Sequence, residues 1–354
     1  MPKIKVSFIG LGRVFNHYLF IIKKFKLNNL IQIDCLCDQD KSLIKKFSKK
    51  INGKFYSSID KFLDNCSSDV IFILTPSGKH YEHSLKAMNR NFNVISEKPI
   101  TMTSLEGLKL KKIANKKKVA YGVIFQNRFN PAITHVKNIL NKKQIGKITN
   151  FSVRLIWCRY QSYYNDKWHG TWKNDGGVLN QQAIHHLDAL NWLIGPIKNV
   201  FANCSNQANR LEAEDTITSI LKLKNNAVGT FHATTAARPK DIFAEISIFG
   251  TKGFLEVSGP ALNELKRVNL NNKEYSRSYL NKFSEEVLNG YGFGHAKYIE
   301  LLHKNFIKAG KIIPPISANE GIINTNLVHS FYKSNETNRW QRINNNNKSK
   351  YLGR

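Results

Sequence analysis

The stretch Val6-Ser7-Phe8-Ile9-Gly10-Leu11-Gly12 decides the fold. A short apolar run typical of a strand ends at the first glycine, and the second glycine opens a segment with a helical pattern. Without side chains at this turn, an anion such as a pyrophosphate can approach the N-terminus of the helix, where unpaired N–H groups and the helix dipole favour negative charge. Phe15 replaces the third glycine of the usual dinucleotide fingerprint. We therefore expect a dinucleotide site with looser packing of the helix or a displaced helix. An ordinary turn between a strand and a helix is the alternative.

Strand and helix patterns alternate over the whole N-terminal part of the chain. This alternation is typical of a doubly wound parallel sheet. It predicts an α/β Rossmann domain over residues 1–125. The further apolar runs lie at residues 31–37, 69–74, 93–96 and 119–125, with helix-like segments such as 80–89 and 104–115 between them.

The pattern changes after Asn130-Pro131. A helix-like segment is followed by longer runs that are rich in β-branched and aromatic residues and are joined by tight turns, which favours antiparallel pairing. We predict an α+β domain over residues 126–337 and a basic, polar, solvated tail over residues 338–354. The strand-like runs lie at residues 148–157, 216–223, 228–234 and 243–249.

The charge of the chain first suggests nucleic acid or a membrane surface as a partner, because 54 Lys and Arg against 25 Asp and Glu give a net charge of +29. The lysines are spread over every segment, however, and no basic run accompanies a recognition motif. No stretch approaches the ~20 apolar residues that span a bilayer. We therefore predict neither nucleic acid nor a membrane as partner. Five cysteines without a C-x-x-C motif favour a reducing, cytoplasmic location.

Asp38 ends the second predicted strand. A carboxylate at this place binds the ribose hydroxyls of a dinucleotide and repels a 2′-phosphate, which favours NAD over NADP. Two alternatives stay open. Asp38 could instead cap the next helix, and Lys41 could accept the phosphate of NADP.

Glu97-Lys98-Pro99 directly follows the fourth predicted strand. Ligands of open parallel sheets bind beyond the carboxyl ends of the strands. A lysine near an oxidised nicotinamide would have a lowered pKa and could take a proton from a hydroxyl. The alternative is an ordinary surface lysine in a loop.

A second candidate cluster begins at Gly176-Gly177. A predicted helix after it carries Gln181, His185 and Asp188 on one face, because their spacings are four and three residues. Asp188 could orient the imidazole of His185, although a core histidine is the alternative. A zinc site would need further ligands on that face, so we predict no metal.

Seven short motifs occur along the chain in one order. Together they resemble the Gfo/Idh/MocA family of sugar and cyclitol dehydrogenases over about residues 3–335. The resemblance implies a Rossmann domain, a second domain with an open, mostly antiparallel sheet, and NAD(P)-dependent oxidation of a sugar hydroxyl or the reverse reduction. It also implies a homo-oligomer, either a dimer or a tetramer. The motifs are Gly10-Leu11-Gly12 with His17, Thr75-Pro76-Ser77-Gly78-Lys79-His80, Glu97-Lys98-Pro99, Asn127-Arg128-Phe129-Asn130-Pro131, Gly176-Gly177 through Asp188, Glu214-Asp215-Thr216 and Gly250-Thr251-Lys252-Gly253.

The resemblance also implies the site residues. Lys98 matches the lysine of the family's E-K-P signature, and His185 matches the histidine of its second signature. Gln181, the third expected catalytic residue, stands where the family usually has an aspartate. It can hold a substrate hydroxyl or the nicotinamide ribose but cannot exchange a proton, so acid–base work should fall on Lys98 and His185. We favour His185 as proton acceptor and Lys98 as the group that stabilises the alkoxide, but the sequence does not separate these roles. The expected cofactor-binding residues are Gly10, Gly12, Arg13, Val14, Asp38, Thr75, Pro76, His80, Glu97 and Lys98.

Within the family, Gly170-Thr171-Trp172 followed by residues 175–182 is similar to the branch that acts on UDP-N-acetylhexosamine derivatives in surface-polysaccharide biosynthesis. That branch includes the dehydrogenase that oxidises C3 of UDP-N-acetylglucosaminuronate. Tyr163, Tyr164, Trp168 and Trp172 could stack on the uracil or the sugar, or could simply pack in the core. A free cyclitol or aldose is the alternative substrate, and a cofactor-binding protein without catalysis or a nucleic-acid binder is the alternative of another class. The expected substrate-binding residues are Arg128, Arg159, Trp168, Trp172, Gln182 and Asp188, with Arg154 and Lys167 as further cations.

Overall fold

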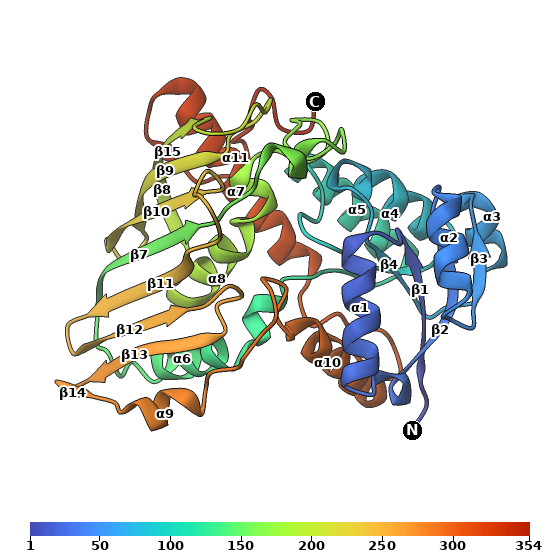
Figure 1. Cartoon of the computed structure of the whole chain (residues 1–354), viewed down its shortest axis with the longest axis horizontal. Coiled ribbons are helices and arrows are strands. Elements are labelled where there is room, and N and C mark those ends of the chain that lie inside the picture. Colours follow the sequence, from blue (N-terminus) through green and yellow to red (C-terminus); the bar gives the residue numbers. More distant parts are fainter. The chain divides into compact units, whose positions relative to one another are not determined.

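The computed structural model describes residues 1–354 and divides the chain into two units. Unit 1 comprises residues 1–125 and 295–325, and unit 2 comprises residues 126–294 and 326–354 (Figure 1). The prediction of one continuous second domain over residues 126–337 is therefore wrong for residues 295–325. Helix α10 (Gly294–Ala309) packs its apolar side within unit 1, where His303 Nε2 lies 3.0 Å from the Pro2 carbonyl oxygen. An amphipathic pattern predicts a buried helix face but does not tell which sheet covers it.

Unit 1 is built on a six-stranded parallel sheet with the order β3-β2-β1-β4-β5-β6, which confirms the predicted Rossmann domain. Its central strands are continuous apolar runs because helices cover both faces of such a sheet; all four residues of β4 are buried. Strand β3 is a three-residue edge strand that the sequence pattern does not predict. The strands are β1 (Ile4–Ile9), β2 (Ile31–Cys37), β3 (Lys54–Tyr56), β4 (Val70–Ile73), β5 (Asn93–Ser96) and β6 (Tyr121–Val123).

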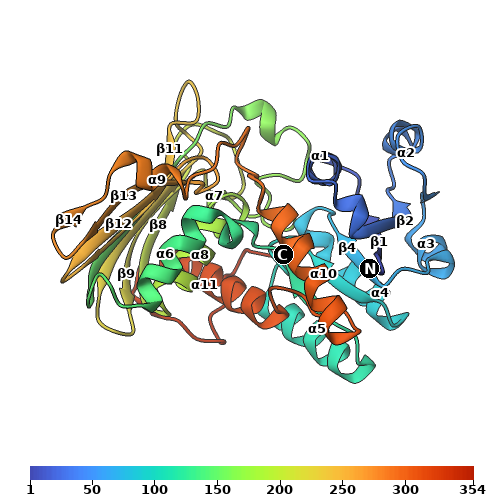
Figure 2. The same cartoon turned by 90° about the horizontal axis from the view of Figure 1, so that it is seen from below.

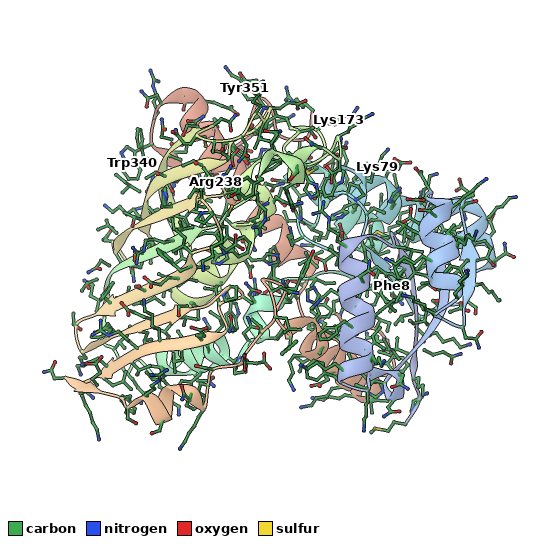
Figure 3. The ribbon with its side chains drawn as sticks, in the orientation of Figure 1. Phe8, Lys79, Lys173, Arg238, Trp340 and Tyr351 are labelled. Carbon is green, nitrogen blue, oxygen red and sulfur yellow. The ribbon has the colours of Figure 1, made fainter.

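Phe15 does not loosen the packing of the first helix. Its side chain is fully buried, and its ring centroid lies 5.2 Å from that of Phe8 and 5.1 Å from that of Phe47. Phe8 on β1 is labelled in Figure 3. The aromatic ring thus takes a place in the core between strand and helices, and the expectation of looser packing is wrong. The helices of this part are α1 (Arg13–Lys24), α2 (Lys41–Ser48), α3 (Ile59–Asn65), α4 (His80–Asn89) and α5 (Ser104–Lys117).

Unit 2 is built on a nine-stranded sheet with the order β14-β13-β12-β11-β7-β10-β9-β8-β15. Only the pair β7–β10 is parallel, which confirms the open, mostly antiparallel sheet. Helices α6 (Pro131–Asn141) and α8 (Ile184–Ile194) lie on one face of this sheet (Figure 2). The strands are β7 (Ile148–Ile156), β8 (Ile197–Ser205), β9 (Thr216–Leu223), β10 (Val228–Thr234), β11 (Phe243–Gly250), β12 (Gly253–Ser258), β13 (Glu264–Leu270), β14 (Lys273–Glu274) and β15 (Gln341–Arg342).

The C-terminal segment is part of unit 2, so the prediction of a solvated tail over residues 338–354 is wrong. Strand β15 pairs with β8, and Ser349 and Leu352 are buried. Side chains of α11 (Ala318–Thr337) hold the segment: the Ser330 hydroxyl accepts a hydrogen bond from Asn347 Nδ2 at 2.8 Å. A polar composition does not distinguish a solvated segment from one whose polar groups find partners in the fold.

None of the helices combines the length and the apolar character that crossing a bilayer requires.

Candidate active site

The glycine turn of unit 1 lies between β1 and α1. Gly10 has φ = +98°, and a Cβ on it would come within 2.7 Å of the carbonyl carbon of Leu74, so only glycine fits there. Gly12 differs, because a Cβ on it would meet nothing within 4 Å. The first glycine therefore lets the turn pass β4 closely, and the second leaves open space in front of the helix.

The N-terminus of α1 faces this open space. The first N–H groups of a helix have no partner within the helix, and here no side chain caps them and no acidic residue occupies the first turn. Arg13 and Val14 supply the first two of these groups. The turn therefore fits the diphosphate of a dinucleotide, which needs N–H donors and a positive dipole end.

Asp38 ties the end of β2 to the glycine turn. Its Oδ2 accepts a hydrogen bond from the N–H of Leu11 at 2.7 Å, and its Oδ1 accepts one from the N–H of Asp40 at 2.9 Å. The cap of α2 is Asp40, which accepts from the N–H of Ser42 at 2.8 Å. The helix-cap alternative for Asp38 is thus wrong, whereas its binding of a ribose stays a prediction.

His80 joins the two loops that follow β4 and β5. The buried imidazole places Nε2 2.8 Å from the carbonyl oxygen of Thr75 and Nδ1 2.6 Å from that of Pro99. Burial lowers the pKa of this histidine. His80 therefore supports the loops of Thr75-Pro76 and of Lys98.

Glu97 has a partner that the sequence analysis missed. Its buried carboxylate lies 3.2 Å from Nε2 of His295, and it accepts a hydrogen bond from the N–H of Lys98 at 3.2 Å. Burial by itself would raise the pKa of Glu97, but the hydrogen bond and charge of His295 bring it below its usual value. A buried carboxylate demands a partner, yet the sequence marks none of the 11 histidines as that partner, and His295 lies 198 residues further along the chain.

Lys98 is half-buried and lies just beyond the carboxyl end of β5. Glu97 before it is fixed by His295, and Pro99 after it is fixed by His80. Because the carboxyl ends of parallel strands share one edge of the sheet, unit 1 collects the glycine turn, Asp38 and Lys98 at that edge.

In unit 2, the predicted single helix with Gln181, His185 and Asp188 on one face is wrong. Helix α7 (Val178–Gln181) ends after one turn, and α8 starts at Ile184. The N–H of Ala183 bonds to the carbonyl of Val178, five residues back, at 2.8 Å. Such wide turns occur frequently at functional sites. Gln181 and His185 are half-buried on either side of this break, whereas Gln182 within it is buried.

A buried carboxyl group fills the N-terminus of α7. Oε1 of Glu214 accepts hydrogen bonds from the N–H of Leu179 and from the hydroxyl of Tyr332, both at 3.0 Å. A Cβ on Gly177 would collide with this carboxyl group. Burial raises the pKa of Glu214 to about 7. In the sequence, Glu214 stands out only as part of the motif Glu214-Asp215-Thr216, which assigns it no role.

Arg128 and Asp188 are partners of each other. Nε of Arg128 donates to Oδ2 of Asp188 at 2.7 Å, and Nη2 donates to Oδ1 at 2.6 Å. The two side chains are 7% and 1% exposed. This two-pronged pair fixes α8 to the loop before α6, which is a positioning role that the sequence did not predict. Direct contacts of these two residues with substrate, or of Asp188 with His185, stay predictions.

The aromatic segment of unit 2 contains buried and half-buried rings. The ring of Trp172 lies 5.1 Å from that of Tyr332 and 5.6 Å from that of Tyr351, which is labelled in Figure 3. Trp172 therefore packs against the C-terminal segment, as the core alternative predicts. Trp168 is half-buried.

Arg159 is held at the surface of the same unit. Its guanidinium lies 5.1 Å from the centre of the Trp157 ring, and Nη1 donates to Asp241 Oδ1 at 2.8 Å. The side chain keeps 24% of its surface exposed. It is a fixed, partly accessible cation.

Comparison with known proteins identifies the family. Residues 4–125 match the oxidoreductase family with the NAD-binding Rossmann fold, and residues 133–256 match the GFO/IDH/MocA C-terminal domain. The chain belongs to the Gfo/Idh/MocA oxidoreductase family. As a member of that family it is an NAD(P)-dependent oxidoreductase that acts on CH–OH groups, with the dinucleotide held by the Rossmann unit.

Two solved structures of this family are similar over nearly the whole chain. The WlbA dehydrogenase of Bordetella pertussis, in complex with NADH and UDP-GlcNAcA, is 27% identical, with a TM-score of 0.90 and coverage of 97% of this chain and 98% of that one. The WlbA dehydrogenase of Chromobacterium violaceum, in complex with the same two ligands, is 29% identical, with a TM-score of 0.88 and coverage of 97% and 96%. A third relative, the scyllo-inositol 2-dehydrogenase (NADP(+)) of Bacillus subtilis, is 27% identical over 44% of this chain and 43% of its own length.

Proposed function

We propose that this oxidoreductase oxidises a hydroxyl group of a UDP-N-acetylhexosamine, in particular its uronate, with NAD as the coenzyme. The observation that carries the proposal is the full-length similarity to two dehydrogenases described with NADH and UDP-GlcNAcA. The similarity includes unit 2, which supplies the candidate substrate residues. A surface-polysaccharide pathway is the corresponding setting.

The residues of unit 1 suit the coenzyme. Bound there, a nicotinamide dinucleotide supplies the hydride acceptor. The N–H groups at the start of α1 would bind its diphosphate, and Asp38 would bind the ribose hydroxyls. NAD is the proposed form because a 2′-phosphate would lie next to the Asp38 carboxylate.

The proton of the reacting hydroxyl needs an acceptor. Lys98 in unit 1 and His185 in unit 2 are half-buried side chains of types that serve as general acids and bases. We assign proton acceptance to His185 and stabilisation of the alkoxide to Lys98. Gln181 offers an amide that donates and accepts hydrogen bonds to a sugar hydroxyl but takes no proton.

A cationic surface suits a UDP-sugar with a carboxylate. Arg159 is held over Trp157 and keeps part of its guanidinium exposed. A preorganised guanidinium forms two-pronged hydrogen bonds to phosphate or carboxylate. Trp168 is half-buried and offers a ring for stacking on uracil.

The test is turnover of UDP-N-acetylglucosaminuronate with NAD, followed by the absorbance of reduced nicotinamide. Lys98→Ala and His185→Ala should each lose about 10²–10⁴ in rate with folding intact. Lys116→Ala and His232→Ala, which remove the same residue types at places outside the site, should keep wild-type rates. Near-normal rates in both Lys98→Ala and His185→Ala would contradict the mechanism.

Oxidation of a free cyclitol or aldose is the second candidate, because the scyllo-inositol dehydrogenase is a relative. A melting-temperature panel with NAD, NADP, UDP-sugars and free polyols separates the two, since a ligand that binds the native state stabilises it. A shift with inositol and none with any UDP-sugar would favour the second candidate.

A further inference from the structure

A cluster of sulfur and oxygen groups lies inside unit 1, on the part of β2 that precedes Asp38. Oxygen of Asp34 and the sulfurs of Cys35 and Cys66 all lie within 4.8 Å of one another. Asp34 and Cys35 come from β2, and Cys66 ends α3. The proposed oxidoreductase chemistry uses none of them.

An irregularity of the sheet creates this cluster. Side chains of neighbouring strand residues normally point to opposite faces. Here the register shifts between Val6 and Phe8, which pair with Ile33 and Leu36, so that two residues of β2 face the single residue Ser7. Such a bulge re-aims side chains. Ser7 compensates for the disturbed ladder, because its Oγ accepts the N–H of Cys35 at 2.9 Å.

Hydroxyl groups line the other side of the cluster. Sγ of Cys66 lies 3.3 Å from Oγ of Ser7 and 3.3 Å from Oγ of Ser68. The hydroxyl of Ser68 also donates to Oδ2 of Asp34 at 3.2 Å. The Cys66 thiol therefore faces polar neighbours instead of the apolar packing that an ordinary buried cysteine has.

We propose that Asp34, Cys35 and Cys66 form a binding site for one thiophilic divalent cation of the zinc class. Two thiolates and one carboxylate are a ligand set of the type that Zn²⁺ takes in proteins, and a water or a serine hydroxyl completes four-coordination. Around a tetrahedral zinc, neighbouring ligand atoms lie ~3.8 Å apart, given Zn–S bonds of ~2.3 Å. The three ligand atoms therefore need to approach by at most about 1 Å, and Sγ of Cys66 already lies 4.0 Å from Oδ2 of Asp34.

The proposed site is accessible to an ion from solvent, and a bound ion would stabilise this part of unit 1. Asp34 and Cys66 are partly exposed, whereas Cys35 is buried. An ion would therefore enter past Asp34 and Cys66 and release the protons of the two thiols. It would link β2 to the segment after α3, and thereby hold the strand that presents Asp38.

The experiment uses the reduced full-length chain and Co²⁺ as a spectroscopic substitute for Zn²⁺. We expect one Co²⁺ per chain, with a thiolate-to-cobalt charge-transfer band that one equivalent of Zn²⁺ abolishes. Cys66→Ser should weaken binding at least ~100-fold, because loss of a direct ligand costs more than loss of a residue that only orients a ligand. Asp34→Asn should weaken it less. Cys204→Ser is the matched control, because Cys204 is a partly exposed thiol of unit 2, and it should bind as the wild type does.

Zinc should also raise the melting temperature of the wild type and of Cys204→Ser, but not that of Cys66→Ser. Absence of the band in reduced protein, or an unchanged band in Cys66→Ser, would overturn the proposal. So would a chain that forms a Cys35–Cys66 disulfide with peroxide and takes up no cobalt after reduction. Because the readouts are metal binding and stability, they are independent of the substrate and of turnover.

Discussion

Each unit contains a glycine turn that leads directly into a helix, yet the two turns end differently. In unit 1, no side chain caps α1, and a Cβ on Gly12 would meet nothing within 4 Å. In unit 2, the carboxyl group of Glu214 fills the N-terminus of α7 and would collide with a Cβ on Gly177. The first helix end is available to an external anion, whereas the second already holds an internal carboxyl group. A glycine before a helix therefore predicts that another group can come close to the N-terminus of that helix. The rest of the fold decides whether an internal side chain or an external ligand takes that place.

The largest expected effect on stability is that of Gly177→Ala. The backbone of Gly177 is extended, with φ = −101°, so the cost is steric rather than conformational. A methyl group has no room beside Glu214, and overpacking of this kind should cost about 3 kcal/mol. The measurement is the urea midpoint of unfolding. Gly12→Ala is the matched control and should change the free energy of unfolding by less than ~0.5 kcal/mol. Equal effects of the two substitutions would remove the contrast between the turns.

The internal carboxyl group should make stability depend on pH. The pKa of Glu214 is raised by burial from 4.5 to about 7. Between these values the native state binds more protons than the unfolded state, so the free energy of unfolding falls as pH rises through this window. The free energy of unfolding falls by at most about 3 kcal/mol over this window.

Glu214→Gln isolates the contribution of this titration to stability. The amide oxygen of the variant can still accept hydrogen bonds from the N–H of Leu179 and the hydroxyl of Tyr332. The difference in urea midpoint between wild type and variant should change between pH 4.5 and pH 7 and be constant above about pH 8. A difference that is the same at every pH would show that Glu214 does not titrate in this range.

A smaller effect, on the preference between the two coenzymes, is expected from substitution of Asp38. Asp38→Asn removes the negative charge but keeps an amide oxygen that can accept the N–H of Leu11. The affinity for NADP should rise about 10-fold relative to that for NAD, a change of about 1.4 kcal/mol. Titration of both coenzymes by calorimetry measures it. An unchanged ratio would mean that Asp38 only supports the turn.

Local sequence predicts much of unit 1, because β1, the glycine turn and α1 are contiguous. The edge strand β3 does not follow, since it has only three residues. The strand order does not follow either, since β1 pairs with both β2 and β4, and β4 lies more than 60 residues further along the chain. Phe15 shows the limit of motif rules. A bulky residue at a glycine position is tolerated because Phe47, from another helix, completes its packing.

The sequence predicts which residues belong to the site, but not which side chains form hydrogen bonds with them. Lys98 and His185 follow from motifs, whereas the partners of their neighbours come from distant segments. Glu97 meets His295, and Asp188 meets Arg128. The break between α7 and α8 also escapes sequence periodicity, because a single five-residue turn shifts the helix face.

The most direct measurement of the central claim is the affinity of Gly12→Val for NADH, compared with that of the wild type. The account predicts a urea midpoint close to that of the wild type and a loss of affinity of at least ~100-fold, or about 2.7 kcal/mol, because the side chain fills the space in front of α1. Unchanged NADH binding by a folded Gly12→Val chain would contradict the account.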